Sequence, residues 1–155
     1  MRTYKGKYTP AHPKKYIGDH TKIIYRSGWE RRFMIYCDQT PAVLKWNSES
    51  IIVSYISPVD NRVHKYYVDF LIIVEKANGK QETILIEVKP LAQCNPPKLP
   101  KSGNSNTKRY IKECVTYSVN QAKWDAAKAL CAKKGWTWKV MTENELTPKG
   151  KKKKK

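Results

Sequence analysis

The sequence has no long apolar run, no CxxC pair and few acidic side chains. Without an apolar stretch of about 20 residues we expect no membrane-spanning helix, and no signal-peptide core is present either. No histidine stands at zinc-finger spacing from a cysteine, so we expect no structural zinc site and reduced thiols at the four cysteines: Cys37, Cys94, Cys114 and Cys131. These absences favour a soluble intracellular protein.

The shortage of acidic residues leaves a large excess of positive charge. Lys and Arg number 31 against 13 Asp and Glu, which gives a formal net charge of +18. Such a field attracts polyanions, and nucleic acid is favoured over a membrane surface because no isolated basic amphipathic helix is seen. At 155 residues the chain is long enough for one domain with a real core.

Both ends of the chain are basic and lack periodicity. Residues 1–22 are predicted to form an extended arm that lies over the body of the domain. The lysines and tyrosines of this arm either contact nucleic acid or belong to a passive strap. Residues 148–155 form a polylysine tail that we expect to be disordered. The domain itself is predicted to span residues 23–147.

Between the ends, the pattern predicts an α/β fold. Ser27 and Glu30 form a capping-box pattern at the start of a helix that runs to about Asp38. Three strands of an antiparallel meander are then expected at about 50–57, 63–75 and 81–89. A mobile Pro- and Lys-rich loop leads to a long helix over about 107–134, which Gly135 ends, and to a further strand at 136–141.

Charged side chains interrupt strands that are otherwise apolar. In QETILIEVK the alternation places Glu87 and Lys89 on one face, and Asp69 lies in YYVDFLIIV, where an unpaired carboxylate is costly. Carboxylates that hold Mg²⁺, with a lysine that offsets developing charge, are what phosphodiester hydrolysis requires. The candidates are Asp69, Glu87, Lys89 and the helix carboxylate Glu30. Simpler alternatives are a surface ion pair for Glu87 with Lys89 and a purely capping role for Glu30.

The turn between the last two strands of the meander decides whether these groups can meet. A two-residue turn would place Asp69 opposite Val88, facing away from Glu87. A three-residue turn of residues 77–79, with Gly79 left-handed, would place Asp69 opposite Glu87. A catalytic role requires the second register or an equivalent bulge, and the sequence permits both.

The order of these motifs resembles the PD-(D/E)xK nuclease superfamily, with Val68 where the motif has proline. Longer stretches resemble head completion nucleases of T-even-type tailed phages and, more distantly, the transposon endonuclease subunit that cuts transposon 5′ ends. These stretches are YRSGWERRFMIYCD, LKWNSESIIVSYISPVDNRVHKYYVDF, ILIEVKP and NQAKWDAAKALCAKKGWTWKVMTENEL.

The resemblance implies a restriction-endonuclease-like core, with one mixed sheet flanked by helices, and a magnesium-dependent DNA endonuclease, with Mn²⁺ as an alternative ion. Asp69, Glu87 and Glu30 would be the metal ligands and Lys89 the lysine of the motif. An activated water would attack the phosphorus in line while Lys89 helps to position it. Gln121 and Lys123 on the long helix would support the site.

We expect double-stranded DNA as the substrate, bound by the arm, the tail and exposed cations: Arg31, Arg32, Lys98, Lys101, Lys108 and Arg109. The resemblance further implies head, portal or neck proteins as partners, and action in the host cytoplasm or in the virion neck. The alternatives are a non-cleaving neck or DNA-end-binding protein and a transposon- or repair-type endonuclease. A homodimer would suit double-strand cutting, but no residue pattern demonstrates one.

Overall fold

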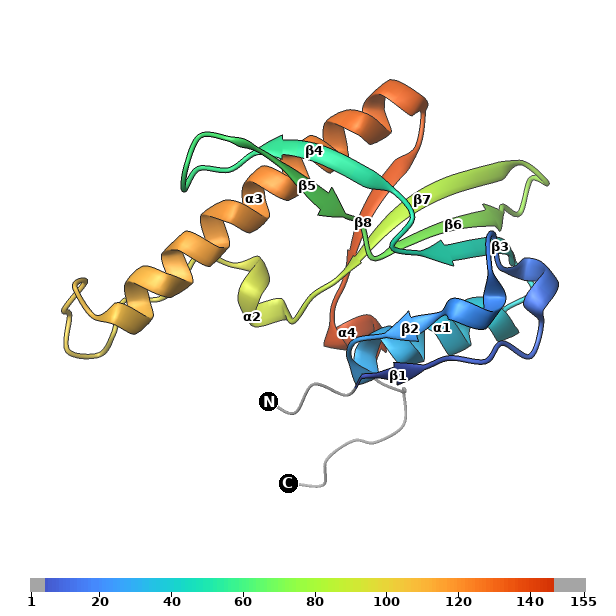
Figure 1. Cartoon of the computed structure of the whole chain (residues 1–155), viewed down its shortest axis with the longest axis horizontal. Coiled ribbons are helices and arrows are strands. Elements are labelled where there is room, and N and C mark those ends of the chain that lie inside the picture. Colours follow the sequence, from blue (N-terminus) through green and yellow to red (C-terminus); the bar gives the residue numbers. More distant parts are fainter. Residues whose placement is uncertain (1–4, 147–155) are drawn as a thin grey trace.

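The structure is a computed structural model that describes residues 5–146. Figure 1 shows how the helices and strands are arranged. In chain order they are β1 (Gly6–Lys7), the 3₁₀ helices η1 (Pro13–Lys15) and η2 (His20–Lys22), β2 (Ile24–Tyr25), α1 (Gly28–Gln39), β3 (Val43–Ser48), β4 (Ile52–Ile56), β5 (Val63–Tyr67), β6 (Phe70–Glu75), β7 (Gln81–Val88), α2 (Leu91–Cys94), α3 (Lys108–Lys134), β8 (Thr137–Met141) and α4 (Glu143–Leu146).

A mixed sheet of four strands forms the centre, in the order β3-β6-β7-β8. The β3–β6 and β6–β7 pairs are antiparallel, and β8 joins β7 in parallel after the α3 crossover. In Figure 1, α1, α4 and the β1–β2 pair lie on one side of the sheet, and α3 with the β4–β5 pair lies on the other. The predicted α/β class with a mixed sheet flanked by helices is therefore confirmed.

Apolar side chains fill both faces of this sheet. On the α1 side, Phe33, Trp46, Phe70 and Ile86 belong to one buried cluster. A second cluster on the α3 side contains residues from the sheet, the hairpin and the helix: Val53, Tyr66, Leu71, Leu85 and Trp124. Successive residues of β6 and β7 enter opposite clusters, as the alternation of a strand requires.

The two main helices begin and end where the sequence predicts. The Ser27 hydroxyl accepts a hydrogen bond from the amide of Glu30 (3.1 Å), which caps α1. Thr107 caps α3 in the same way, through the amide of Tyr110 (3.3 Å). Gly135 follows α3 in the left-handed conformation (φ +69°), which glycine adopts without a Cβ clash.

Two features of the strands differ from the expectation. The strand β3 lies in a segment where we predicted none, and a bulge between Val43 and Lys45 disturbs the alternation that would have revealed it. The expected strand at 63–75 is interrupted at Val68 and Asp69. The antiparallel pairings β4–β5 and β6–β7 are those expected, but the meander is split, and β4–β5 forms a separate two-stranded sheet.

The described part of the N-terminal arm is fastened to α1. Strand β1 pairs with β2, and the ring of Tyr8 is buried in the α1-side cluster. The carboxylate of Asp38 accepts hydrogen bonds from the Tyr8 hydroxyl (2.9 Å) and from the amides of Ala11 (2.7 Å) and His12 (2.9 Å). Burial acts to raise the pKa of Asp38, but these hydrogen bonds outweigh it and leave the pKa below its ordinary value. The described part of the arm is thus an ordered strap.

The polylysine tail at 148–155 lies outside the described residues. Within residues 5–146, no helix is both long enough and apolar enough to cross a membrane.

Candidate active site

The turn between β6 and β7 has the three-residue form. The amide of Lys76 donates to the carbonyl of Lys80 (2.8 Å), and the amide of Gly79 donates to the carbonyl of Lys76 (2.9 Å). Gly79 is left-handed, with φ at +78°. Phe70 consequently pairs with Ile86, so the register is the one that a catalytic site at this place requires.

This register brings Asp69 and Glu87 to neighbouring positions. Asp69 directly precedes β6, and continuing the pairing by one residue places it across from Glu87 at the end of β7. The amide of Val88 donates a hydrogen bond to Oδ2 of Asp69 (2.9 Å), which ties the carboxylate to β7. The side chain of Asp69 is half-buried, and Glu87 is only 6% exposed.

The two carboxylates meet in poorly solvated surroundings. Burial, and then the nearby charge of Glu87, raise the pKa of Asp69 well above its ordinary value. The amide of Val88 and the charge of Lys89 act in the opposite direction without offsetting these effects. Ionisation of Asp69 beside Glu87 is therefore disfavoured unless a cation stabilises the negative charge.

Glu87 has a different neighbour at each oxygen. The ammonium of Lys89 lies 3.8 Å from Oε1, and the hydroxyl of Tyr66 donates a hydrogen bond to Oε2. Burial and the charge of Glu87 raise the pKa of Tyr66, so its hydroxyl stays protonated and remains a donor. Because Glu87 is buried and Lys89 is 25% exposed, this pair is not the solvated surface pair considered above.

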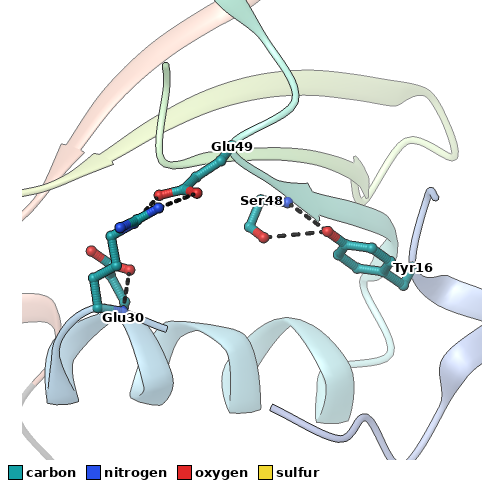
Figure 2. A network of polar contacts seen from close by, with 5 residues as sticks. Tyr16, Glu30, Ser48 and Glu49 are labelled. Atoms are coloured by element: carbon teal, nitrogen blue, oxygen red, sulfur yellow. Dashed lines mark hydrogen bonds and ion pairs between the residues drawn. The ribbon is translucent and has the colours of Figure 1, made fainter. Parts of the chain in front are cut away.

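Glu30 combines a structural contact with a position near the acidic pair. Figure 2 shows Glu30 at the start of α1 and Glu49 facing it from the end of β3. Oε2 of Glu30 accepts from the amide of Arg26 (3.0 Å), and the Arg26 guanidinium binds Glu49 through Nε–Oε1 (2.7 Å) and Nη2–Oε2 (3.3 Å). Burial raises the pKa of Glu30; the Arg26 amide lowers it, but the charges of Glu49 and Glu87 add to the rise.

Glu49 belongs to this acidic neighbourhood, although the sequence gives no sign of it. Its backbone is left-handed (φ +53°), and its amide donates to the carbonyl of Asp69 (3.1 Å). Ser48, the preceding residue, is held by the strap, because the hydroxyl of Tyr16 lies 3.2 Å from its Oγ (Figure 2). The position of Glu49 depends on its own left-handed backbone conformation, and no periodicity or motif in the sequence indicates that conformation.

The two residues predicted to support the site, Gln121 and Lys123, lie on α3. The ammonium of Lys123 on α3 lies over the rings of Tyr66 (5.6 Å to the centroid) and Tyr55 (5.8 Å). Gln121 is half-buried on the same helix, and its side chain makes no hydrogen bond to another described residue.

The predicted DNA-binding cations are all exposed, but they form two groups. Arg31 and Arg32 lie on α1, where the Arg31 guanidinium stands 6.0 Å from the ring centroid of Tyr25. The other four lie along the loop before α3 and at the start of that helix, which projects at one end of the molecule (Figure 1): Lys98, Lys101, Lys108 and Arg109.

The donor set suits a hard divalent cation only in part. Within residues 5–146, no group of three or more His, Cys, Asp or Glu side chains stands close enough to hold a metal ion. Mg²⁺ keeps several waters and is often bound by one or two carboxylates, so the oxygens of Asp69 and Glu87 meet its minimum requirement. Glu30 does not complete a three-carboxylate group in this structure.

Two comparisons with known proteins bear on the family and the activity of the chain. Residues 40–143 match the family model described as TnsA-like endonuclease N terminal. The chain is also 35% identical, over 148 residues, to the head completion nuclease of Enterobacteria phage T4, a match that covers 95% of this chain and 96% of that protein. Both matches support a nuclease role, and the chain belongs to the TnsA-like endonuclease family.

Proposed function

We propose that this protein is a magnesium-dependent DNA endonuclease that hydrolyses phosphodiester bonds during phage head completion and head-tail joining. Asp69 and Glu87 would hold the metal ion, for which Mn²⁺ could substitute, and Glu30 would assist them. The observation that carries the proposal is the meeting of Asp69 and Glu87 across the β6–β7 register, with Lys89 beside them.

Each residue of the site has a defined task in this reaction. When bound, Mg²⁺ supplies Lewis-acid stabilisation of the phosphoryl oxygens and lowers the pKa of attacking water. Lys89 presents a positive charge next to Oε1 of Glu87, where it orients the nucleophile and offsets charge that develops on the phosphate. The Val88 amide keeps the Asp69 carboxylate turned toward β7, which reduces the reorganisation needed at the moment of reaction.

Duplex DNA is bound through its phosphates. The net charge of +18 supplies long-range attraction, and the exposed cations on α1 and around the start of α3 supply direct contacts. No residue pattern encodes base readout, which fits an enzyme that recognises a DNA structure or a stage of assembly.

The match to a phage head completion nuclease supports a role in phage assembly. We place the activity in the infected host cytoplasm or the virion neck, with head, portal or neck proteins as partners and a homodimer as the form that cuts both strands. The TnsA-like family match favours a second candidate, a transposon- or repair-type endonuclease with the same chemistry. Pull-down of partners from infected cells separates the two.

Cleavage of supercoiled plasmid tests the chemistry. We expect the parent to nick plasmid in Mg²⁺ and to stop in EDTA. Lys89→Gln should lower the rate by about 10²–10³-fold, and Asp69→Asn and Glu87→Gln at least as much. Glu75→Gln, at the exposed far end of β6, is the matched control and should cut like the parent.

Binding measured on the same proteins identifies the alternative. Parent protein that binds DNA but never nicks it in Mg²⁺ or Mn²⁺ would contradict the proposal and indicate a non-cleaving neck or DNA-end-binding protein. Equal nicking by the parent and Glu87→Gln would show that the reaction occurs elsewhere in the molecule.

A further inference from the structure

A buried contact joins the small β4–β5 sheet to the proposed site. Tyr66 lies on β5, outside the four-stranded sheet that carries Glu87, and each of the two side chains is 6% exposed. The Tyr66 hydroxyl donates its hydrogen bond to Oε2 of Glu87. A tyrosine buried only for packing would make no hydrogen bond to this carboxylate.

The contact makes the two oxygens of Glu87 unequal. Tyr66 occupies Oε2, and Oε1 is the oxygen that lies 3.8 Å from the ammonium of Lys89. A hydrogen bond of this kind fixes the rotation of a ligating carboxylate and thereby sets which oxygen is available to a cation. Glu87 is thus prepared to offer one oxygen on the side where Lys89 lies.

The ring of Tyr66 also has a cation beside it, the ammonium of Lys123 on α3. Its ammonium lies 5.6 Å from the centroid of that ring and 5.8 Å from that of Tyr55, within the range of a cation–π interaction. The two aromatic rings come from paired strands: Tyr66 on β5 lies opposite Val53 on β4, and Tyr55 lies two residues after Val53. Lys123 therefore reaches the site through Tyr66 and not through a contact with the carboxylates.

We propose that Tyr66 is a positioning residue that orients Glu87 for the cation, and that Lys123 keeps the Tyr66 ring in place. This inference rests on the proposed function, because it assigns Tyr66 a part in the same site. It also gives the β4–β5 hairpin a role in the reaction, although neither of its strands carries a proposed ligand.

The test compares Tyr66→Phe with Tyr55→Phe in the full chain. Each change removes one hydroxyl from a ring beneath Lys123, but only Tyr66 is bonded to Glu87. We expect Tyr66→Phe to weaken Mn²⁺ binding, measured without DNA by electron paramagnetic resonance, by about 10- to 100-fold. It should lower kcat for plasmid nicking and leave KM for DNA unchanged, and Tyr55→Phe should change neither.

Lys123→Met is the second variant and changes no residue that touches Glu87. We expect the same direction of effect on Mn²⁺ affinity and kcat, but a smaller one, with Lys128→Met, exposed on α3, as its control. Lys123→Met leaves the buried hydroxyl of Tyr66 in place, so it can be used to test the inference if Tyr66→Phe fails to fold.

The possible failures are distinguishable. If the parent binds Mn²⁺ and nicks DNA, but Tyr66→Phe does both equally well, the inference is overturned while the proposed function stands. If the parent neither binds Mn²⁺ nor nicks DNA, the proposed function fails, and the contact between Tyr66 and Glu87 serves packing alone. A loss in Tyr66→Phe that Tyr55→Phe reproduces would also overturn the specific role of Tyr66.

Discussion

At the scale of single residues, Asp69 is held where its charge is poorly solvated. Burial and the charge of Glu87 raise its pKa in the folded state. A carboxyl group whose pKa is raised by folding binds its proton more tightly in the native state, so the native state loses stability as the pH rises through that pKa. The ionised form that the proposed reaction needs is therefore a cost to folding at neutral pH.

This conflict predicts that Asp69→Asn stabilises the metal-free protein. In EDTA at about pH 8, we expect its melting temperature to exceed that of the parent by about 2–4 °C, the shift that about 1 kcal/mol produces in a chain of this size. The difference should shrink as the pH falls to about 4 and below, where an ordinary aspartate in the unfolded chain takes up its proton. Melting curves across this range check it.

The control for this prediction is Asp125→Asn, which changes a carboxylate exposed on α3. Its effect on the melting temperature should not follow the same pH trend. A lower melting temperature for Asp69→Asn at about pH 8 would contradict the view that the ionised carboxylate strains the fold.

Single residues also show how far sequence reasoning reaches. Asp69, Glu87 and Lys89 could be selected as site candidates because a charge inside an apolar strand requires compensation. The roles assigned to them stay predictions. Glu49 could not be found from the sequence, because its position depends on its own left-handed backbone and on its contact with Arg26. Tyr66 could not be found either, because an aromatic residue in an alternating strand has the pattern of a core residue.

At the scale of elements, the β6–β7 turn determines which side chains share a face. A slip of one residue would move every side chain of β7 to the other side of the sheet. The hydrophobic pattern cannot choose between the two registers, because both faces of these strands are buried and both offer apolar pairs. Strand β3 was missed because its bulge hides the alternation of a short strand.

The left-handed turn residue predicts a specific cost. Gly79→Ala should lower the free energy of unfolding by about 1 kcal/mol, because alanine resists the positive φ although its Cβ would meet open space. Nicking activity should persist, since the number of turn residues sets the register. Urea unfolding measures the change.

Gly28→Ala provides the matched comparison for the turn. Gly28 is the first residue of α1, where a Cβ also meets open space but the backbone is not left-handed. It should be neutral or slightly stabilising. Equal stability of Gly79→Ala and the parent would show that the turn does not adopt the left-handed form.

At the scale of the whole molecule, the order of helices and strands was enough to predict the α/β fold class, and the composition was enough to predict the net positive charge. Neither pattern could reveal that β4–β5 leaves the main sheet, because that depends on a break at Val68 and Asp69 inside a continuous apolar segment. The net positive charge does not depend on how the strands are arranged, and it predicts that binding to DNA depends on the salt concentration.

DNA binding should weaken steeply with salt. Each phosphate contact adds about −0.9 to the slope of log K against log salt concentration. The double variant Lys108→Gln/Arg109→Gln should reduce the magnitude of this slope by about 1 to 2. Fluorescence anisotropy with a short duplex at several salt concentrations measures it.

The double variant Lys128→Gln/Lys133→Gln removes the same charge from the body and far end of α3, and is the control for a general field effect. It should leave the slope nearly unchanged. An equal fall in slope for both double variants would indicate that net charge, and not the free end of α3, binds the duplex.

The strap held by Asp38 limits how far the chain can be shortened from its start. A fragment beginning at Ile23 would lose the ring of Tyr8 from the core and all three donors that satisfy the Asp38 carboxylate. A buried carboxylate without donors is costly, so α1 would lose its support on that side. Because α1 carries Glu30, the carboxylate proposed to assist the site, we expect the smallest active fragment to include the strap, even though the family match begins only at residue 40.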